Sequence, residues 1–355
     1  MVYFVYERKI KGADSAPLTG TARGANMAEK KKEKRIRSLY IDSEKDDQLS
    51  KIAKQSGTSL SNAATKILND KLDELSDRES ILPTIIVFSN FKGGVAKTTS
   101  VKEVGYNLSK RGYKVLLIDL DGQSNLSSSF EVYDPKELDG YISDVILADG
   151  NGKRRKLSDV IISTDYENLD LAPANLSFAS ADNKIRSQEG GAIDRRLLYA
   201  IQDLTTEAAY DYIIIDCPPT TDSVVQNAIM ALQAGNSRSM IIVPINSDTQ
   251  AIDGLDRTAE LVDTVCLDNR LSKPQVIALW TNARTNEVLY QVTKADFENT
   301  HDNFPQFETV ITASTKVGQA RILQKTATEH ARGEKVAVCY KNVTDEIVKL
   351  TAAQI

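Results

Sequence analysis

Short apolar runs alternate with amphipathic stretches from residue 84 to the end of the chain. The runs have the length of strands, and the stretches between them have the apolar spacing of helices. Apolar strands separated by helices indicate a mostly parallel sheet covered on both faces, which is a doubly wound α/β fold. The predicted strands are Ile85–Ser89, Val115–Asp119, Asn168–Ala172, Tyr212–Asp216, Met240–Pro244 and Val276–Thr281.

The pattern in the N-terminal part is that of a strand followed by two helices. Residues 37–42 alternate like a short strand, and Ser43 can cap a helix that ends at Gly57. A second helix is expected to begin at Ser59 or Ser61. The predicted inner faces of the two helices are formed by Leu49, Ile52, Ala53, Ala64, Ile67, Leu68, Leu72 and Leu75. About forty residues are too few for a good core, so we expect this unit to dimerise.

Charge is distributed unevenly along the 355 residues, whose formal net charge is −5. Residues 1–80 carry 16 Lys and Arg against 13 Asp and Glu, whereas the remaining residues carry 28 against 36. Six basic side chains lie within Ala28–Arg37, and such a run either binds nucleic acid or forms a solvated tail. Residues 1–26 have little apolar periodicity, so we expect them to be mostly disordered. Asp77–Pro83 is polar and ends in proline, which indicates a linker.

The overall composition is that of an ordinary globular protein, with 41% hydrophobic and 26% charged residues. The apolar runs are far shorter than the roughly 20 residues that cross a bilayer, and no secretory signal pattern is present. Three cysteines and two histidines at scattered positions match neither a disulfide framework nor a zinc site. These features favour a cytoplasmic protein without a structural metal of its own.

Residues 36–75 resemble a ribbon–helix–helix DNA-binding module, in which strands from two copies pair and lie in the major groove. Residues 27–76 are therefore assigned as a DNA-binding or dimerisation module. A helix–turn–helix over Leu49–Leu68 fits the same residues, and so does a helical dimerisation module without a role on DNA. The resemblance places Ile36, Ser38 and Tyr40 on the side that faces the groove. The DNA-binding residues expected in this segment are Arg35, Arg37, Ser38 and Tyr40.

The strongest chemical signal is a glycine-containing loop between the strand Ile85–Ser89 and a helix. The inner face of that helix is formed by Val101, Val104 and Leu108. The loop and the first helical turn contain Lys92, Gly93, Gly94, Val95, Ala96, Lys97, Thr98 and Thr99. In this context backbone N–H groups bind phosphate, Lys97 reaches the β- and γ-phosphates, and the Thr98 hydroxyl can ligate Mg²⁺. Phe91 and Ala96 stand where the strict pattern has glycine, so the loop has the deviant form K-G-G-x-x-K-T-T.

This loop resembles that of the ParA/MinD family of deviant P-loop ATPases, and further matches follow over residues 83–350. Val115–Ser124 (VLLIDLDGQS) is similar to the family segment V-L-L-x-D-x-D-P-Q, with Gly122 in place of proline. Tyr210–Pro219 (YDYIIIDCPP) is similar to the Walker B strand of the family. The resemblance implies a ParA-like ATPase domain over residues 84–355, with ATP and Mg²⁺ as cofactors.

The resemblance also implies roles for individual residues. Thr98 and Asp216 would hold Mg²⁺, Asp216 through a bound water at the end of its strand. Asp121 would orient the attacking water, and Asp119 would support the metal site or the neighbouring loop. Lys92 would reach the phosphates of the other subunit in an ATP-bound dimer. Without the resemblance, Lys92 has the pattern of a solvated loop lysine.

Two further segments match the family less well. Thr281–Thr285 is similar to a segment near the nucleotide base, where Asn282 could bind the adenine edge, although a surface turn fits equally. Val310–Ala320 aligns with the family stretch I-P-R-N-V-x-L-x-E-A, but Thr312 and Ala313 replace its Pro-Arg. The basic residues left for a DNA contact near this segment are Lys316 and Lys325.

Together these features predict a ParA-type ATPase that dimerises on binding Mg-ATP, binds DNA and partitions plasmid DNA. Its hydrolysis would be stimulated by a ParB-like centromere-binding or cargo-adaptor protein. Two alternatives remain open: a DNA-binding repressor regulated by nucleotide, and a ParA-like ATPase that positions another intracellular cargo. The segment Asp345–Ile355 has one lysine and no aromatic residue, so no membrane anchor is expected. We expect a cytoplasmic, nucleoid-associated location.

Overall fold

The computed structural model describes residues 4–11, 32–39, 43–68, 82–135, 137–149, 151–176, 193–220 and 223–352. The chain divides into two compact units, Met1–Arg78 and Glu79–Ile355. Their boundary lies within the segment Asp77–Pro83. Within the described ranges, no helix is both long and apolar enough to cross a membrane.

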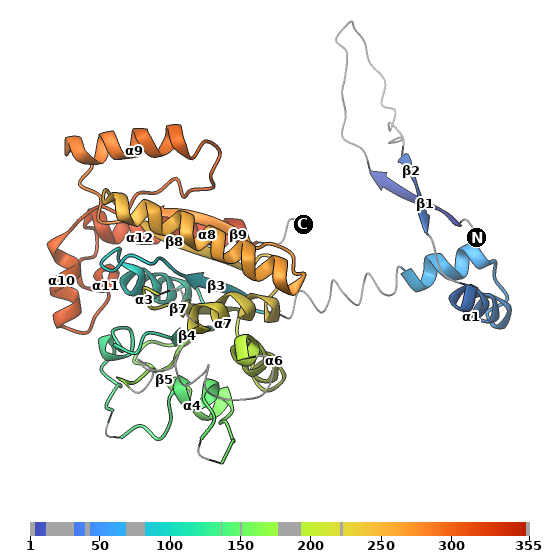
Figure 1. The fold of residues 1–355 in the computed structure, drawn as a ribbon, viewed down its shortest axis with the longest axis horizontal. Coiled ribbons are helices and arrows are strands. Elements are labelled where there is room, and N and C mark those ends of the chain that lie inside the picture. The colour runs from blue at the N-terminus through green and yellow to red at the C-terminus, as the bar shows by residue number, and fades with distance from the viewer. Residues whose placement is uncertain are drawn as a thin grey trace, which may run out of the picture. The chain divides into compact units, whose positions relative to one another are not determined.

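The larger unit is built on a seven-stranded sheet in the order β5-β6-β4-β7-β3-β8-β9 (Figure 1). Its strands are β3 (Thr84–Phe88), β4 (Val115–Asp119), β5 (Ile162–Ser163), β6 (Leu169–Ala172), β7 (Tyr212–Asp216), β8 (Met240–Ile245) and β9 (Gln275–Trp280). Every pairing is parallel except that of β5 with β6. The six predicted strands are confirmed to within one residue at each end. The edge strand β5 escapes prediction because it is only two residues long.

Alternate residues of the strands face two different cores, one on each side of the sheet. In β3, Ile85 and Val87 belong to the core that the helices α6, α7 and α8 cover, and Ile86 and Phe88 belong to the core under α3 and α12. The described α-helices of this unit are α3 (Lys97–Ser109), α4 (Ile142–Ile146), α6 (Arg196–Glu207), α7 (Ser223–Ala231), α8 (Thr249–Asn269), α9 (Val288–Thr300), α10 (Thr315–Ile322), α11 (Ala327–His330) and α12 (Lys335–Thr351). Short 3₁₀ turns occupy Ser127–Ser129, Leu157–Asp159, Ile193–Arg195 and Leu232–Ala234. The doubly wound α/β fold is confirmed.

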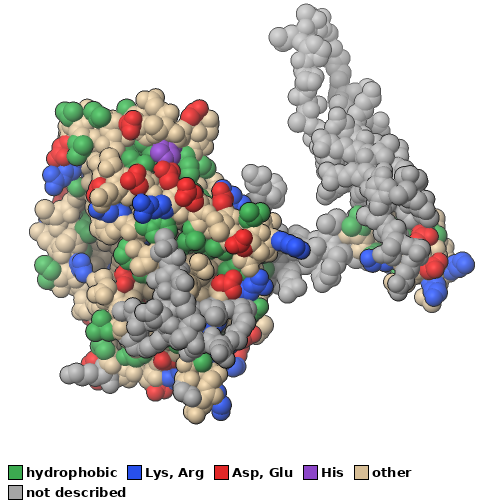
Figure 2. Space-filling view, viewed as in Figure 1, with side chains coloured by type: hydrophobic (Ala, Val, Ile, Leu, Met, Phe, Trp, Pro, Cys, Tyr) green, Lys and Arg blue, Asp and Glu red, His purple; other side chains and the backbone are tan. Residues whose placement is uncertain are grey.

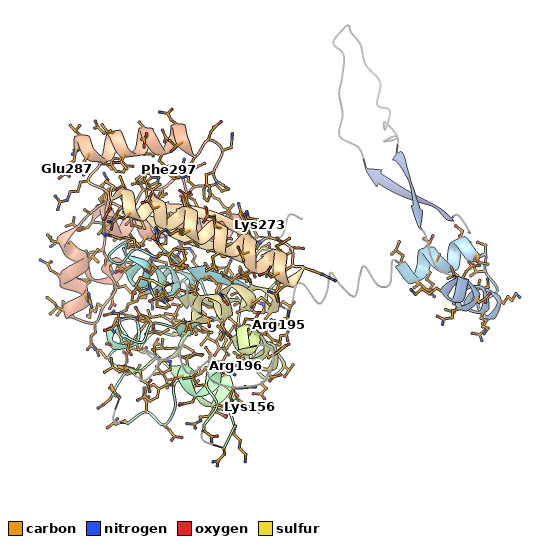
Figure 3. The ribbon with its side chains drawn as sticks, in the orientation of Figure 1. Lys156, Arg195, Arg196, Lys273, Glu287 and Phe297 are labelled. Atoms are coloured by element: carbon orange, nitrogen blue, oxygen red, sulfur yellow. The ribbon has the colours of Figure 1, made fainter. Side chains whose placement is uncertain are left out.

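The outer edge of β9 is covered by the segment that follows α9. The Ala278 N–H donates to the Pro305 carbonyl at 2.8 Å, and the Ile311 N–H donates to the Trp280 carbonyl at 2.9 Å. Phe297 of α9, labelled in Figure 3, packs edge-on against the Trp280 ring, with the ring centroids 5.5 Å apart. The opposite edge of the sheet ends in the short antiparallel strand β5.

The smaller unit contains a pair of strands that the sequence pattern did not predict. β1 (Phe4–Lys11) and β2 (Lys32–Leu39) run antiparallel to each other. The expectation of disorder over residues 1–26 is therefore wrong for β1, and the other residues of that range lie outside the described residues. The strand expected at residues 37–42 lies earlier in the chain, and it pairs with a strand of the same chain. Closing a loop within one chain costs less entropy than associating two molecules, which favours this pairing.

In the smaller unit, the first helix and the start of the second agree with the prediction to within one residue, and the end of the second helix lies outside the described residues. α1 (Ser43–Gln55) is followed by Gly57, whose φ of 64° lies in the left-handed region that glycine favours. The second helix covers residues 60–68 of the described part. The Ser59 hydroxyl oxygen accepts the Asn62 N–H at 3.2 Å, so Ser59 is the capping residue.

The core between these helices is small and differs from the predicted one. Leu49, Ala53 and Ala63 form it. The expectation that Ile52 and Ile67 face inward is wrong, because their exposed fractions are 41% and 44%. Two short helices bury only the narrow strip where they touch, which leaves the rest of a wide apolar face open. Of the other predicted positions, Ala64 and Leu68 are half-buried, and Leu72 and Leu75 lie outside the described residues.

Candidate active site

The phosphate loop joins β3 to α3 and turns through two left-handed residues. Gly94 has a φ of 80°, and Ala96, directly before α3, has a φ of 61°. Among the described residues, no side chain caps the N-terminus of α3. The first N–H groups of the helix are therefore available to an anion, as phosphate binding requires.

Asn90 fixes this loop to the neighbouring strand and helix. Its buried amide donates to the carbonyls of Pro244 at 2.8 Å and Ala251 at 3.0 Å, and its Oδ1 accepts the Lys92 N–H at 2.8 Å. A Cβ atom at Gly254 of α8 would lie 2.0 Å from the Asn90 Oδ1, so this close approach requires glycine. Asn90 is not recognisable in the sequence, because one polar residue after a strand has no pattern of its own.

The side chain of Lys97 reaches back across the phosphate loop. Its ammonium group donates to the carbonyls of Asn90 at 2.9 Å and Lys92 at 3.1 Å. Burial lowers the pKa of Lys97, and the nearby carboxylate of Asp216 acts in the opposite direction. A buried cation whose partners are neutral carbonyls can exchange them for phosphate oxygens at a gain in electrostatic energy.

Two carboxylates stand side by side at the ends of β4 and β7. Asp119 accepts hydrogen bonds from the N–H of Asp121 at 3.0 Å and from the N–H and hydroxyl of Ser127 at 2.9 and 2.6 Å. Burial raises its pKa to about 6. Neither carboxylate oxygen of the fully buried Asp216 has a hydrogen-bond partner in the described part of the chain. Burial, and then Asp119, raise the pKa of Asp216 well above its usual range, while Thr98 and Lys97 lower it.

The two carboxylates therefore have different chemistry. Asp119 already accepts hydrogen bonds from the loop that follows β4. The oxygens of Asp216, in contrast, lack the hydrogen-bond donors that a buried carboxylate needs. A hydrated Mg²⁺ ion would supply those donors through its water molecules and would bring a positive charge beside Asp216. The donor set of the site, a threonine hydroxyl and a carboxylate beside a phosphate loop, suits this hard cation.

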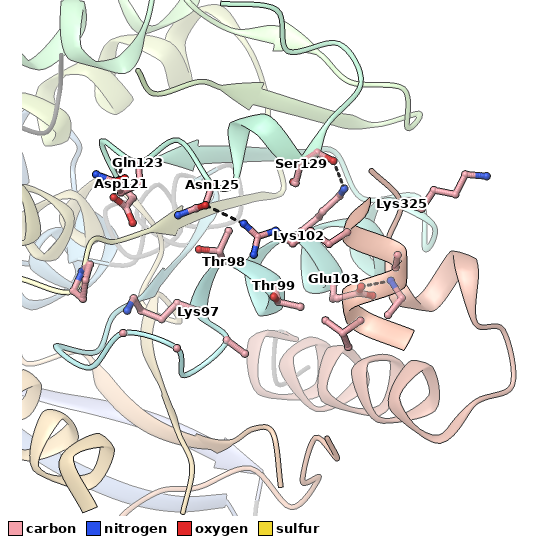
Figure 4. Close-up of a pocket in the computed structure, with 18 residues that line it drawn as sticks. Lys97, Thr98, Thr99, Lys102, Glu103, Asp121, Gln123, Asn125, Ser129 and Lys325 are labelled. Atoms are coloured by element: carbon pink, nitrogen blue, oxygen red, sulfur yellow. Dashed lines mark hydrogen bonds between the residues drawn. The ribbon is translucent and has the colours of Figure 1, made fainter. Parts of the chain in front are cut away.

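A cavity of about 370 Å³ opens over the phosphate loop (Figure 4). The predicted site residues that line it are Gly93, Gly94, Ala96, Lys97, Thr98, Thr99 and Asp121. Lining residues that the sequence did not indicate are Lys102, Glu103, Gln123, Asn125, Ser129 and Pro219, together with Val317, Ala320, Arg321 and Ala327 from the C-terminal helices. Lys325, expected as a DNA contact, lies on the same wall. Lys102 and Glu103 escape prediction because charges on a helix usually face water, whereas α3 is buried on nearly every side.

Other predicted site residues lie away from this cavity. The Lys92 ammonium group binds Gln250 Oε1 at 2.6 Å and Asp248 Oδ2 at 3.1 Å, both from the start of α8. Val95 is fully buried. The Asn282 amide donates to the Gly94 carbonyl at 3.3 Å, so this side chain supports the phosphate loop from outside the cavity.

The residues predicted to bind DNA are divided between the two units. Lys316 lies in the first turn of α10 and is half-buried. Arg35, Ile36, Arg37 and Ser38 lie on β2 of the smaller unit, and Tyr40 lies outside the described residues.

Comparison with known proteins agrees with this geometry. A family model described as an AAA domain matches residues 83–273, which is more than half of the chain. The sporulation initiation inhibitor protein Soj of Bacillus subtilis is 31% identical over 215 residues, covering 59% of this chain and 79% of Soj. The chain belongs to the ParA/MinD family of P-loop ATPases.

Two further matches add to the family assignment. The chromosome partitioning protein ParA of Caulobacter vibrioides is 27% identical over 238 residues, covering 66% of this chain and 83% of that protein. The crystal structure of cobyrinic acid a,c-diamide synthase from Mycobacterium smegmatis, with a bound ATP analogue and magnesium, is 25% identical with a TM-score of 0.60. It covers 76% of this chain and 95% of that one. This ParA/MinD-family protein is an ATPase, and its cofactors are ATP and Mg²⁺.

Proposed function

We propose that this ATPase dimerises on binding Mg-ATP, binds DNA and drives the partition of plasmid DNA, with hydrolysis stimulated by a ParB-like partner protein. The observation that carries the proposal is the unpartnered Asp216 carboxylate beside a phosphate loop with intact Lys97 and Thr98. The name of the Caulobacter relative, a chromosome partitioning protein, supports partition as the task.

In this proposal the predicted residues of the nucleotide site have separate tasks. Lys97 and the first N–H groups of α3 hold the β- and γ-phosphates. Thr98 and Asp216 hold Mg²⁺, which neutralises phosphate charge when bound. Asp121 orients the attacking water, and its own orientation is fixed because its Oδ1 accepts the Gln123 N–H at 2.9 Å. Gly93, Gly94, Val95, Ala96 and Thr99 provide the backbone of the phosphate cradle.

Lys92 has its task in the dimer. Within one chain its ammonium group rests on Asp248 and Gln250, on a side of the loop away from the cavity. The side chains of Lys92 and Asp248 are 31% and 41% exposed, so the ion pair is weak enough to break. In the ATP-bound dimer we assign Lys92 to the phosphates of the partner subunit, where a cation stabilises the charge that develops during transfer.

The experiment compares the full chain with Lys97→Ala, Lys92→Ala and the matched control Lys110→Ala. Lys110 follows α3 at its far end, over the Tyr106 ring and away from the cavity. We expect ATP binding to weaken roughly 10- to 100-fold in Lys97→Ala, because a charged hydrogen-bond donor to the phosphates is lost. Lys92→Ala should bind one nucleotide per chain and remain monomeric with ATP in analytical ultracentrifugation. Unchanged affinity in the first variant, or an unchanged ATP-dependent dimer in the second, would contradict the assigned roles.

A nucleotide-regulated repressor is the second candidate, supported by the separate N-terminal unit with its basic β2 strand. Plasmid retention in dividing cells distinguishes the two. A plasmid that carries the gene and its neighbours should be lost faster with Lys97→Ala if the protein is a partition ATPase. Unchanged retention, together with nucleotide-dependent operator binding, would favour the repressor. Normal retention together with mispositioning of another cargo would indicate a ParA-like positioning ATPase.

A further inference from the structure

The turn between α10 and α11 is bonded to the loop that follows β4. The Gln324 side-chain amide donates to the carbonyls of Ser128 at 3.2 Å and Phe130 at 3.3 Å. Arg321, at the end of α10, donates to the Asn125 Oδ1 at 3.1 Å (Figure 4, dashed line from Asn125). Two elements far apart in the sequence thus form one wall of the nucleotide cavity.

Lys102 of α3 bonds both the loop that follows β4 and the turn between α10 and α11. Its ammonium group donates to the Gln324 carbonyl at 2.7 Å and to the Ser129 carbonyl, and it lies 4.6 Å from the centroid of the Phe130 ring. Only 6% of this residue is exposed, and burial lowers its pKa to about 8. A buried ammonium group is costly, and an apolar side chain of the same length would pack there at a lower cost. A lysine at this buried position is therefore better explained by a function of its charge than by packing.

The loop that Lys102 holds begins at Asp121, the residue assigned to the attacking water. Asp119 fixes the start and middle of this loop through Asp121 and Ser127, and Lys102 fixes its end through Ser129. The α10–α11 turn is in turn anchored to α3, because the Glu103 carboxylate accepts the N–H groups of Ala327 and Thr328. Because Gln324 of this turn bonds the end of the loop, a shift of the turn would also move the end of the loop.

We propose that Lys102 is a positioning residue for ATP hydrolysis, which ties the Asp121 loop to the α10–α11 turn and thereby makes the hydrolysis rate depend on the position of α10. The proposal rests on the proposed role of Asp121 and assigns the regulation of that site. Because α10 also carries Lys316, a contact made at this helix would reach the water-positioning residue through Lys102 and Gln324.

The test is Lys102→Met, with Lys110→Met, directly after the same helix, as the control. Lys110 also lies over aromatic rings, those of Tyr106 and Tyr166, but among the described residues its ammonium group bonds neither the loop nor the turn. We expect the single-turnover hydrolysis rate of Lys102→Met to fall about 10-fold or more, since a misplaced catalytic group costs this much. Its affinity for a fluorescent ATP analogue should stay within about 2-fold, and Lys102→Arg should restore most of the rate. Hydrogen exchange should accelerate at residues 121–130 and 321–328 in Lys102→Met and not in the control.

A second variant tests the same link without removing a buried charge. Gln324 has a φ of 53°, so Gln324→Gly removes the amide without strain in the backbone. It should slow hydrolysis as well, and the double variant should be no slower than the slower single variant, because both act through one link. Normal single-turnover rates in Lys102→Met and Gln324→Gly, while Asp121→Ala is slow, would overturn this inference alone. A normal rate in Asp121→Ala would instead overturn the proposed role of Asp121.

Discussion

Charged side chains are buried around one cavity, and most of their partners are backbone groups. Lys97 and Lys102 donate to carbonyls, and Asp119 accepts N–H groups and a hydroxyl. Backbone partners satisfy a charge without neutralising it, so each side chain keeps its attraction for a charged ligand. Asp216, whose oxygens accept no hydrogen bond among the described residues, is the extreme case. At the residue scale, the free protein is therefore electrostatically prepared for a nucleotide and its cation.

Asp121→Ala should separate binding from chemistry. Lys97, Thr98 and Asp216 are unchanged in this variant, so ATP and Mg²⁺ should bind with wild-type affinity. Hydrolysis should be about 10²-fold slower, or about 2.7 kcal/mol, which is the usual cost of removing one positioned polar group. Single-turnover hydrolysis and nucleotide titration measure the two effects.

Asp149→Ala is the matched control for this experiment. Asp149 accepts the N–H groups of Asn151 at 2.8 Å and Lys153 at 2.9 Å on an exposed loop, the same kind of turn as at Asp121. The control should hydrolyse ATP at the wild-type rate. Normal turnover of Asp121→Ala with weakened Mg²⁺ affinity would move Asp121 from catalysis to the metal site.

The hydrolysis rate should fall as pH rises through about 8. Burial lowers the pKa of Lys102 from 10.5 to about 8, so the folded protein loses this charge at a pH where the unfolded chain keeps it. Loss of the charge weakens both carbonyl bonds that hold the Asp121 loop. Folding stability should change in the opposite sense, because the cost of the buried charge disappears between pH 8 and 10.5. The charged groups around Lys102 are Glu103, Glu131, Asp165, Glu329, Arg321 and Lys325.

Single-turnover rates and urea unfolding between pH 6.5 and 9.5 or so would check both signs. Lys102→Met should lack the step near pH 8 in each measurement. If the step near pH 8 persists in Lys102→Met, it belongs to the titration of another group.

At the scale of elements, α8 supports the phosphate loop through one glycine. Gly254 lets α8 lie against Asn90, which in turn holds the loop through three hydrogen bonds. Asn90 is fully buried and cannot move aside without breaking those bonds. The helix and the loop are therefore closely fitted to each other at Gly254 and Asn90.

Gly254→Ala should weaken both folding and ATP binding. Overpacking of this kind costs about 1–3 kcal/mol, which corresponds to roughly 5- to 160-fold in nucleotide affinity if the loop is displaced. The measurements are urea unfolding and nucleotide titration. Gly318→Ala in α10 is the control, because a Cβ there meets nothing within 4 Å and alanine favours a helix. Equal behaviour of the two variants would show that the contact with Asn90 is unimportant.

Some of these elements follow from local sequence and others depend on contacts that no local pattern records. The strands β4 and β7 are predictable because continuous apolar runs are characteristic of a sheet buried on both faces. The phosphate loop is predictable because its spacing reflects backbone geometry. Lys102 is not, because its partners come from residues more than 20 and more than 200 positions away. The pairing of β1 with β2 also depends on a distant segment, and Asn282 contacts the loop rather than the cavity for the same reason.

The whole molecule consists of two compact units with different charge. On the face of the larger unit shown in Figure 2, acidic and basic side chains are interspersed rather than gathered in one basic area. The basic run of the sequence lies in the smaller unit instead and includes β2. Sequence-specific DNA binding, if the smaller unit provides it, should therefore be separable from ATP binding.

Deleting residues 1–80 should leave ATP binding and hydrolysis intact, because every residue of the cavity belongs to the larger unit. The truncated protein should lose sequence-specific DNA binding. Nucleotide titration and operator footprinting measure the two properties. Retained footprinting would contradict the assignment of the smaller unit to DNA.

The covered edges of the seven-stranded sheet have a consequence for how molecules gather. An open edge strand invites a strand from another molecule, which is a common route to aggregates and fibres. Here the segment after α9 occupies the outer edge of β9, and β5 offers only two residues at the other edge. Where larger units of this ATPase meet at high local concentration, helices and loops therefore come into contact, not the edges of the seven-stranded sheet. Association of many larger units at one place should therefore remain reversible, because contacts between helices and loops can separate again.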